Sequence, residues 1–353
     1  MLNHETLTLL HKGTVIPAHP LALNQDRTLD VEGQKALTRY YVESGAGGIA
    51  VGVHTTQFEI REFGLYERVL QLAIGEINQY KTSVPHIKIA GVCGPTEQAV
   101  KEAKIAQGLG YDLALLSMGG LNDLDEKQLL DRTRQVAEII PVFGFYLQTA
   151  VGGRPLSYDF WQEFCLIENL YAIKIAPFNR YQTLDVIRAV CNSPRNEEIA
   201  IYTGNDDNIV VDLLTTYRIP VKDKIVSKEI VGGLLGHWAV WTKEAVELFT
   251  RIKNAKKDGL IDNRLLSTAA EVTDINSALF DTNNQFKGCI AGINSVLSQQ
   301  GLLKGPWCLL EEETLSPGQS DEIERVKKLY PHHCNDQFIK DNVSRWRQEL
   351  NAL

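Results

Sequence analysis

The stretch Leu170-Tyr171-Ala172-Ile173-Lys174-Ile175-Ala176-Pro177 places a lysine in the middle of an apolar run. An apolar run of this length that ends at a proline predicts a buried β-strand. Because side chains alternate between the two faces of a strand, Lys174 shares its face with the small residues Ala172 and Ala176. Lysine is rarely buried unless it is paired or used, so Lys174 is the first candidate for chemistry.

Two interpretations of Lys174 are open at this point. A desolvated ammonium group has a lowered pKa, and the neutral amine can attack a carbonyl carbon to form a Schiff base. The alternative is a lysine whose amine extends to solvent or pairs with a carboxylate. General residue preferences favour the second interpretation, so the surrounding sequence has to decide.

Short apolar runs alternate with stretches of helical period through residues 1–258. Strands are expected at 13–18, 48–53, 87–92, 113–117, 142–146, 170–175, 199–203 and within 224–234. Helices are expected at 31–43, 65–80, 96–109, 126–139, 157–165, 181–191, 207–217 and 243–252. Eight consecutive strand–helix units over about 250 residues predict a (β/α)8 TIM barrel. A doubly wound open sheet is the alternative, although no glycine-rich phosphate turn follows the first strand.

The strand patterns stop after the barrel. Residues 259–353 instead carry helical patterns at 265–280, 288–297, 320–329 and 336–350, with a loop rich in glycine and proline over 301–317. The expected fold class is therefore α/β, a barrel catalytic domain followed by a C-terminal α-helical extension.

The composition of the chain disfavours several classes of function. Its 353 residues include 36 Lys and Arg and 44 Asp and Glu, which gives a formal net charge of −8. A mildly acidic chain with dispersed charge is a poor candidate for nucleic acid or an anionic membrane. Scattered cysteines and an N-terminus without a signal-peptide pattern favour a reduced, cytoplasmic protein.

In a (β/α)8 barrel, catalytic groups come from the carboxyl ends of the strands. His54, Thr55 and Thr56 follow the second strand. Paired hydroxyls with their backbone N–H groups suit a carboxylate or a phosphate, although threonines also end strands and cap helices. His54 is either an acid/base group or ligand to substrate hydroxyls, or a packed histidine at a strand end.

Two other strand ends carry polar groups. On the fifth strand we expect Phe143 and Phe145 to face the helices and Tyr146 to face the barrel axis, where it can pass a proton or simply be a satisfied core tyrosine. After the seventh strand, Gly204 allows close approach of a ligand to the backbone. Asn205 is a substrate-binding candidate, although Asn205 or Asp206 could instead cap the next helix, and capping is the stronger interpretation of the acidic pair Asp206-Asp207.

An inward lysine and an inward tyrosine on adjacent strands, with a threonine pair on the same rim, predict a class I aldolase. Lys174 forms an imine, Tyr146 and Thr55 move protons, and Thr55 and Thr56 hold the carboxylate of a 2-keto acid. No metal or other cofactor is expected, because the imine supplies the electrophile. His332-His333-Cys334 is interpreted as a solvated turn, since adjacent residues rarely chelate together.

These segments resemble the dihydrodipicolinate synthase/N-acetylneuraminate lyase superfamily of Schiff-base barrels. His54-Thr55-Thr56-Gln57-Phe58-Glu59 is similar to the family's Gly-Thr-Thr-Gly-Glu loop, and Tyr146 to the tyrosine of its Tyr-Asn-x-Pro segment. Ile173-Lys174 is similar to the Gly-x-Lys imine lysine, and Thr203-Gly204-Asn205-Asp206 to a Ser-Gly-Asp-Asp turn. The resemblance implies a lyase that acts on pyruvate or a related 2-keto acid with an aldehyde co-substrate, in a homo-oligomer (a dimer or tetramer).

The chain also departs from that family. The segment after Tyr146 is longer, so Arg154 is not expected to replace the synthase arginine that binds the second substrate. Met118-Gly119-Gly120 stands where the synthase has a tyrosine pair. These departures point away from dihydrodipicolinate synthesis itself. They leave open a dehydratase or hydratase-aldolase on a sugar acid or aromatic substrate, and a non-catalytic 2-keto-acid-binding barrel.

Overall fold

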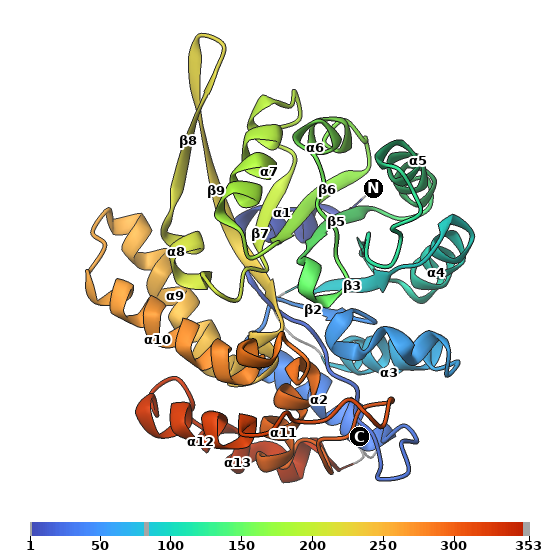
Figure 1. Cartoon of the computed structure of the whole chain (residues 1–353), viewed down its shortest axis with the longest axis vertical. Helices are drawn as coiled ribbons and strands as arrows, with labels where there is room; N and C mark the ends of the chain where they lie inside the picture. The colour runs from blue at the N-terminus through green and yellow to red at the C-terminus, as the bar shows by residue number, and fades with distance from the viewer. Residues whose placement is uncertain (1, 81–84, 349–353) are drawn as a thin grey trace.

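A computed structural model of the chain describes residues 2–80 and 85–348 (Figure 1). Within these residues a nine-stranded sheet follows the order β1-β9-β7-β6-β5-β4-β3-β2, with β8 paired to β9 outside this path. All neighbours on the path are parallel. The barrel strands are β1 (Val15–Pro17), β2 (Gly48–Val51), β3 (Ile87–Val92), β4 (Leu113–Leu116), β5 (Val142–Leu147), β6 (Leu170–Ala176), β7 (Ala200–Thr203) and β9 (Lys224–Leu235).

The two ends of the sheet meet between β1 and β2. Ala18 and Ala50 form an isolated parallel bridge there, and the backbone N–H of His19 donates to the carbonyl of Ala50 at 2.8 Å. The N–H of Gly47 donates to the carbonyl of Val15 at 3.1 Å. Because these contacts join the first and last strands of the path, the sheet is a nearly closed barrel, and the predicted (β/α)8 fold is confirmed.

The helices of the barrel surround the sheet, and each follows a strand. They are α2 (Val31–Glu43), α3 (Tyr66–Gln79), α4 (Thr96–Leu109), α5 (Glu126–Ala137), α6 (Tyr158–Phe164), α7 (Arg180–Asn192), α8 (Ile209–Leu214) and α9 (Thr242–Asp258). Local sequence decides where several begin. Asp125 accepts the N–H of Gln128 at 2.8 Å, and the Gln128 side chain accepts the N–H of Asp125 at 2.9 Å, which forms a capping box before α5.

The last unit of the barrel differs from the prediction. The helix expected at 207–217 is only α8, because Thr216–Val221 forms β8 and pairs antiparallel with the first half of β9. This hairpin projects from the body of the barrel at the top of Figure 1. The prediction was wrong over 216–217 because Tyr217, Ile219 and Val221 alternate with exposed residues, which is a strand pattern.

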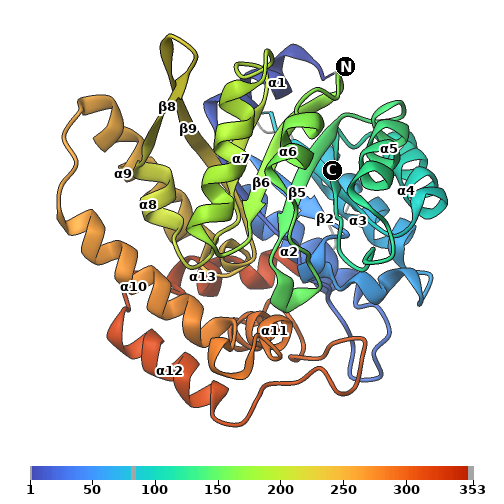
Figure 2. The ribbon, with the colours of Figure 1, turned by 45° about the horizontal axis from the view of Figure 1, so that its top comes forward.

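A helix that the sequence patterns did not reveal, α1 (His4–Lys12), closes the amino end of the barrel. Its Leu10 is fully buried in the barrel interior, and the Tyr202 hydroxyl donates to the Leu10 carbonyl at 2.9 Å. Figure 2 shows α1 and the C-terminal helices α10 (Arg264–Leu279), α11 (Cys289–Gln299) and α12 (Gln319–Leu329) on opposite sides of the barrel. The carboxyl ends of the strands therefore face the extension.

The C-terminal extension packs against the helices on the outside of the barrel. Its last helix, α13 (Gln337–Trp346), lies against α2, where Arg39 pairs with Glu76 at 2.7 Å and donates to the carbonyl of Trp346 at 2.6 Å. Buried residues of the barrel and of the extension form one continuous hydrophobic cluster. The domain division between 258 and 259 stays a prediction, and residues 349–353 lie outside the described part. In the described residues, no helix combines the length and the apolar character that a membrane crossing needs.

Candidate active site

A cavity lies at the carboxyl ends of the barrel strands. Residues from the ends of β1, β2, β5, β6, β7 and β9 form its floor, and residues after α10 and at the start of α11 form part of its wall. Active sites of (β/α)8 barrels lie at this end of the fold. The cavity is therefore the candidate active site.

Lys174 projects into the cavity from β6 and is only 9% exposed. On β5 its ladder partner is Phe145, so the two side chains share the inner face, with the amine 4.3 Å from the centre of the Phe145 ring. Among the described residues, the amine has no hydrogen bond or ion pair. Burial lowers the pKa of Lys174 below its ordinary value of 10.5, and the negative charge of Asp206 partly opposes this shift.

Gly204, which follows β7, makes room for the lysine. A Cβ atom at Gly204 would lie 2.4 Å from Cε of Lys174 and 2.8 Å from Cβ of Ala176. Both distances are below any real contact, so the aliphatic part of Lys174 crosses the Gly204 backbone only because no side chain is there. Gly204 lines the cavity, as the sequence suggested for a close approach to the backbone.

The sequence patterns did not identify Asp206 as a site residue. Its carboxyl group lines the cavity with Lys174, and the residue is 8% exposed. One carboxyl oxygen accepts the backbone N–H of His237 at 3.2 Å. Burial raises the pKa of Asp206, and the positive charge of Lys174 opposes the rise. The expected helix-capping role was wrong, because the residue at the N-cap of α8 is Asn208.

The two threonines predicted to bind a carboxylate, Thr55 and Thr56, have different surroundings. Thr55 lines the cavity. The hydroxyl of Thr56 instead donates to the carbonyl of His19 at 2.6 Å and accepts the N–H of Gly52 at 2.9 Å, so it holds the turn after β2. The side chain of Thr56 is thus absent from the described cavity wall, contrary to its predicted role in binding a carboxylate.

His54 lies in the cavity wall next to Thr55. Burial lowers the pKa of His54 to about 4, and the positive charge of Lys174 adds to this effect. The imidazole is therefore neutral near pH 7 and can accept or donate a hydrogen bond without carrying charge.

Tyr146 does not face the cavity, and the orientation predicted for the fifth strand was wrong. Its ring packs 5.0 Å from the ring of Trp161 on α6, and its hydroxyl accepts the N–H of Leu156 at 3.2 Å. Phe143 and Phe145 point into the barrel instead. The physical reason is on the outer face, where Gly144 leaves space for Phe164, so the even-numbered positions face α6.

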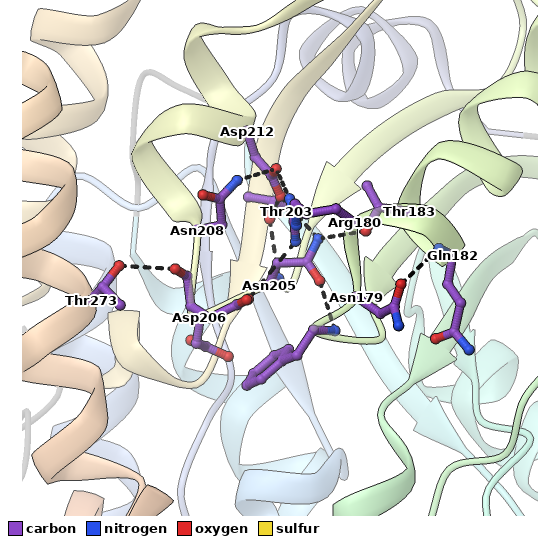
Figure 3. Close-up of polar contacts among 12 residues, drawn as sticks. Asn179, Arg180, Gln182, Thr183, Thr203, Asn205, Asp206, Asn208, Asp212 and Thr273 are labelled. Atoms are coloured by element: carbon purple, nitrogen blue, oxygen red, sulfur yellow. Dashed lines mark hydrogen bonds and ion pairs between the residues drawn. The ribbon is translucent and has the colours of Figure 1, made fainter.

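A buried polar network, centred on Asp212 of α8, braces the loops around the cavity (Figure 3). Oδ2 of Asp212 accepts the Thr203 hydroxyl at 2.7 Å and the Asn205 amide at 2.9 Å. Its Oδ1 accepts Arg180 at 2.5 Å. The amide oxygen of Asn205 accepts the N–H of Phe178 at 3.1 Å. Asn205 was a predicted substrate-binding residue, but its side chain is occupied by this bracing network.

The extension supplies aromatic side chains to the cavity wall. Phe280 and Phe286 line it together with Cys289, and the Phe286 ring lies 5.9 Å from the ring of Phe178. Phe178 and Phe286 have φ values of 51° and 65°, a backbone region that is strained for bulky residues. Such strain is typical of functional sites, where the surrounding structure holds it. No local pattern in the sequence marks these residues, because they reach the cavity only through tertiary packing.

Two polar groups that the sequence singled out lie elsewhere. Arg154 donates to the backbone carbonyls of Leu121 and Leu124 at 2.9 and 2.6 Å and is not among the residues that line the cavity. His332 and His333 both contact one carboxyl oxygen of Glu271, at 3.1 and 3.0 Å, and so join this turn to α10.

Comparisons with known proteins bear on this geometry. The model of the Dihydrodipicolinate synthetase family matches residues 11–328. A 4-hydroxy-tetrahydrodipicolinate synthase of Sulfurihydrogenibium sp. (strain YO3AOP1) is 26% identical over 211 residues, which cover 58% of this chain and 69% of that protein. N-acetylneuraminate lyase 2 of Escherichia coli O6:H1 is 22% identical over 330 residues, 92% of this chain and 97% of the lyase.

Solved structures show the same fold. Dihydrodipicolinate synthase from Oceanobacillus iheyensis superposes with a TM-score of 0.73 at 16% identity, and covers 92% of this chain and 99% of its own. N-acetylneuraminate lyase from Fusobacterium nucleatum gives a TM-score of 0.68 at 18% identity, with coverage of 91% and 99%. Since these matches span more than nine-tenths of the chain, they include part of the C-terminal extension as well as the barrel.

The bracing network predicts a stability effect. Asp212→Ala is expected to lower the free energy of unfolding by about 2–6 kcal/mol, since the buried Thr203 hydroxyl and Asn205 amide each lose an acceptor at about 1–3 kcal/mol. Arg180 is partly exposed and can turn to water, so it adds little. Urea denaturation measures the change.

The matched control is Asp185→Ala, which removes the exposed pair with Arg188 on α7. This variant is expected to change the free energy of unfolding by less than about 1 kcal/mol. Equal effects of the two substitutions would contradict the bracing role of Asp212.

Proposed function

The chain belongs to the dihydrodipicolinate synthetase family, and from this membership we propose that it is a lyase that binds pyruvate or a related 2-keto acid as an imine of Lys174. The reaction is cleavage or formation of the C–C bond next to that imine. The observation that carries the proposal is the amine of Lys174, buried without a hydrogen-bond partner among the described residues and sharing one cavity with a single carboxyl group, that of Asp206.

The chemistry starts with the neutral amine of Lys174. It attacks the keto carbon, and loss of water leaves a protonated imine that draws electrons from the neighbouring C–H bond. Removal of a proton from that carbon gives an enamine, which attacks the carbon of an aldehyde and forms the new C–C bond. The aldehyde oxygen takes up a proton, and water then releases the product and restores Lys174. The same steps in reverse cleave the bond.

Asp206 is the group that we assign to the proton transfers. Its raised pKa brings the carboxyl closer to neutral pH, where a general base both takes and returns protons efficiently. We assign the hydroxyl of Thr55 to binding the substrate carboxylate. Thr55 lines the cavity, and its hydroxyl has no hydrogen-bond partner among the described residues. His54, neutral and in the same wall, is available to hydrogen-bond a substrate oxygen.

The imine is tested by trapping. Borohydride added with pyruvate is expected to leave a stable adduct on the wild-type protein, and mass spectrometry of peptides is expected to locate it at Lys174. Lys174→Ala should give no adduct, whereas Lys127→Ala, which removes an exposed lysine on α5, should give the wild-type amount. An undiminished adduct in Lys174→Ala would contradict the proposal. A barrel that only binds pyruvate would bind it without forming any adduct.

Asp206 is tested by exchange of the pyruvate methyl hydrogens in D2O, which NMR follows without an aldehyde. Asp206→Asn is expected to slow this exchange by about 10²–10⁴ while imine trapping persists. The carboxylate raises the pKa of Lys174, so its removal should lower that pKa further. The pH midpoint of imine formation should therefore fall in the variant. An upward shift, or exchange at the wild-type rate, would contradict the assignment.

Tyr146 provides the contrasting variant, because the family resemblance gives the proton transfer to this residue. Its hydroxyl bonds to the backbone of Leu156 outside the cavity. Tyr146→Phe is therefore expected to leave methyl exchange within about threefold and to cost about 1 kcal/mol of stability for the lost hydrogen bond. A loss of exchange comparable to that of Asp206→Asn would return the role to Tyr146.

The assembly state follows from the family alone. Its members are often oligomeric, and we extend this to the present chain as a homo-oligomer.

A further inference from the structure

The walls of the cavity are mainly carbon, apart from the groups already assigned to chemistry. Phe145, Leu147 and Val151 approach from β5 and the turn after it, and Phe178 follows β6. The extension adds Phe280 and Phe286, and the Phe286 ring lies against that of Phe178. A ligand that fills the space beyond the imine must therefore contact aromatic rings and aliphatic chains.

The cavity also lacks a cation for a second anionic group. Within the described wall, Lys174 is the one side chain that carries positive charge near pH 7, and its amine is consumed by the imine. His54 is neutral at that pH. The two arginines nearest in sequence to these wall residues are both engaged elsewhere: Arg180 pairs with Asp212, and Arg154 donates to the carbonyls of Leu121 and Leu124.

The cavity wall also offers few hydrogen-bond partners to a substrate with several hydroxyl groups. Beyond Thr55 and the neutral His54, the uncharged polar side chains of the described wall are Gln148 and the weak donor Cys289. A polar group that enters such a site without a partner loses its hydrogen bonds to water, whereas each buried methylene is favourable. The wall thus selects against both charge and multiple hydroxyls.

Building on the proposed function, we infer that the second substrate is an aldehyde with an uncharged, apolar substituent, either a short alkyl chain or an aromatic ring. The carbonyl carbon of this aldehyde takes the new bond from the enamine, and its oxygen takes a proton. The substituent does not react and lies against the phenylalanines. This substrate class differs from a charged semialdehyde or a sugar.

The test uses the purified full chain with pyruvate and four aldehydes: butanal, benzaldehyde, glyceraldehyde and succinic semialdehyde. Product formation is measured by chromatography, with Lys174→Ala as the blank for uncatalysed addition. The expected kcat/KM is at least tenfold higher for butanal and benzaldehyde than for the other two. Within an alkyl series from ethanal to butanal, kcat/KM should rise about fourfold for each methylene that is buried.

A substitution checks the missing cation. Val151→Arg places a positive charge in the wall and is expected to shift the kcat/KM ratio of succinic semialdehyde to butanal upward by at least tenfold. Leu166→Arg is the matched control, because Leu166 is 51% exposed in the loop before β6, at the other end of the barrel. The ratio should stay at the wild-type value in the control.

The outcomes separate the two proposals. Failure of borohydride trapping with pyruvate would reject the imine function. A normal adduct combined with preference for glyceraldehyde or succinic semialdehyde, or with no turnover of the apolar aldehydes, would overturn the inference about the substrate and leave the imine in place. A normal adduct with preference for butanal or benzaldehyde supports both.

Discussion

Exclusion of water from the space around Lys174 and Asp206 is the constraint on which the rest of the site depends. In water the amine would remain protonated near neutral pH and the carboxylate would be a weak base. Burial moves the two pKa values toward each other, while their opposite charges limit how far each moves. In the proposed function these two ordinary side chains act as the nucleophile and the proton carrier. The price is a pair of ionisable groups held in the interior, which the surrounding structure has to stabilise.

Two parts of the fold stabilise the structure around this buried pair. The network around Asp212 ties β7 and α8 to the loop after β6, and thereby holds Phe178 in its strained conformation. The extension closes the other side, where Asn276 of α10 donates to the backbone carbonyl of Asp206 and Phe280 and Phe286 cover the cavity. Because the extension shares a continuous core with the barrel, these walls are fixed by packing, as in the interior of a single domain.

The fifth strand, β5, shows where prediction of side-chain direction from sequence fails. Lys174 and its inward direction could be predicted, since the small residues on either side of it marked one face of a buried strand. Tyr146 could not, because a difference of one residue in alternation exchanges the two faces of a strand. The deciding contact, Phe164 against Gly144, joins a helix to a strand and has no signature in either segment. Asp206 was overlooked for a similar reason, since a polar residue after a strand is more often a helix cap.

The sequence by itself determined the barrel, the helical extension and the lysine, because each is encoded in the period and polarity of neighbouring residues. Tertiary structure alone decided which strand ends face inward, that Thr55 and Thr56 separate, and that the extension completes the cavity wall. It also decided that a carboxyl group and a neutral histidine, rather than a tyrosine, share the cavity with the lysine. These outcomes depend on contacts between segments far apart in the chain, and on the burial that such contacts create, so no local pattern carries them.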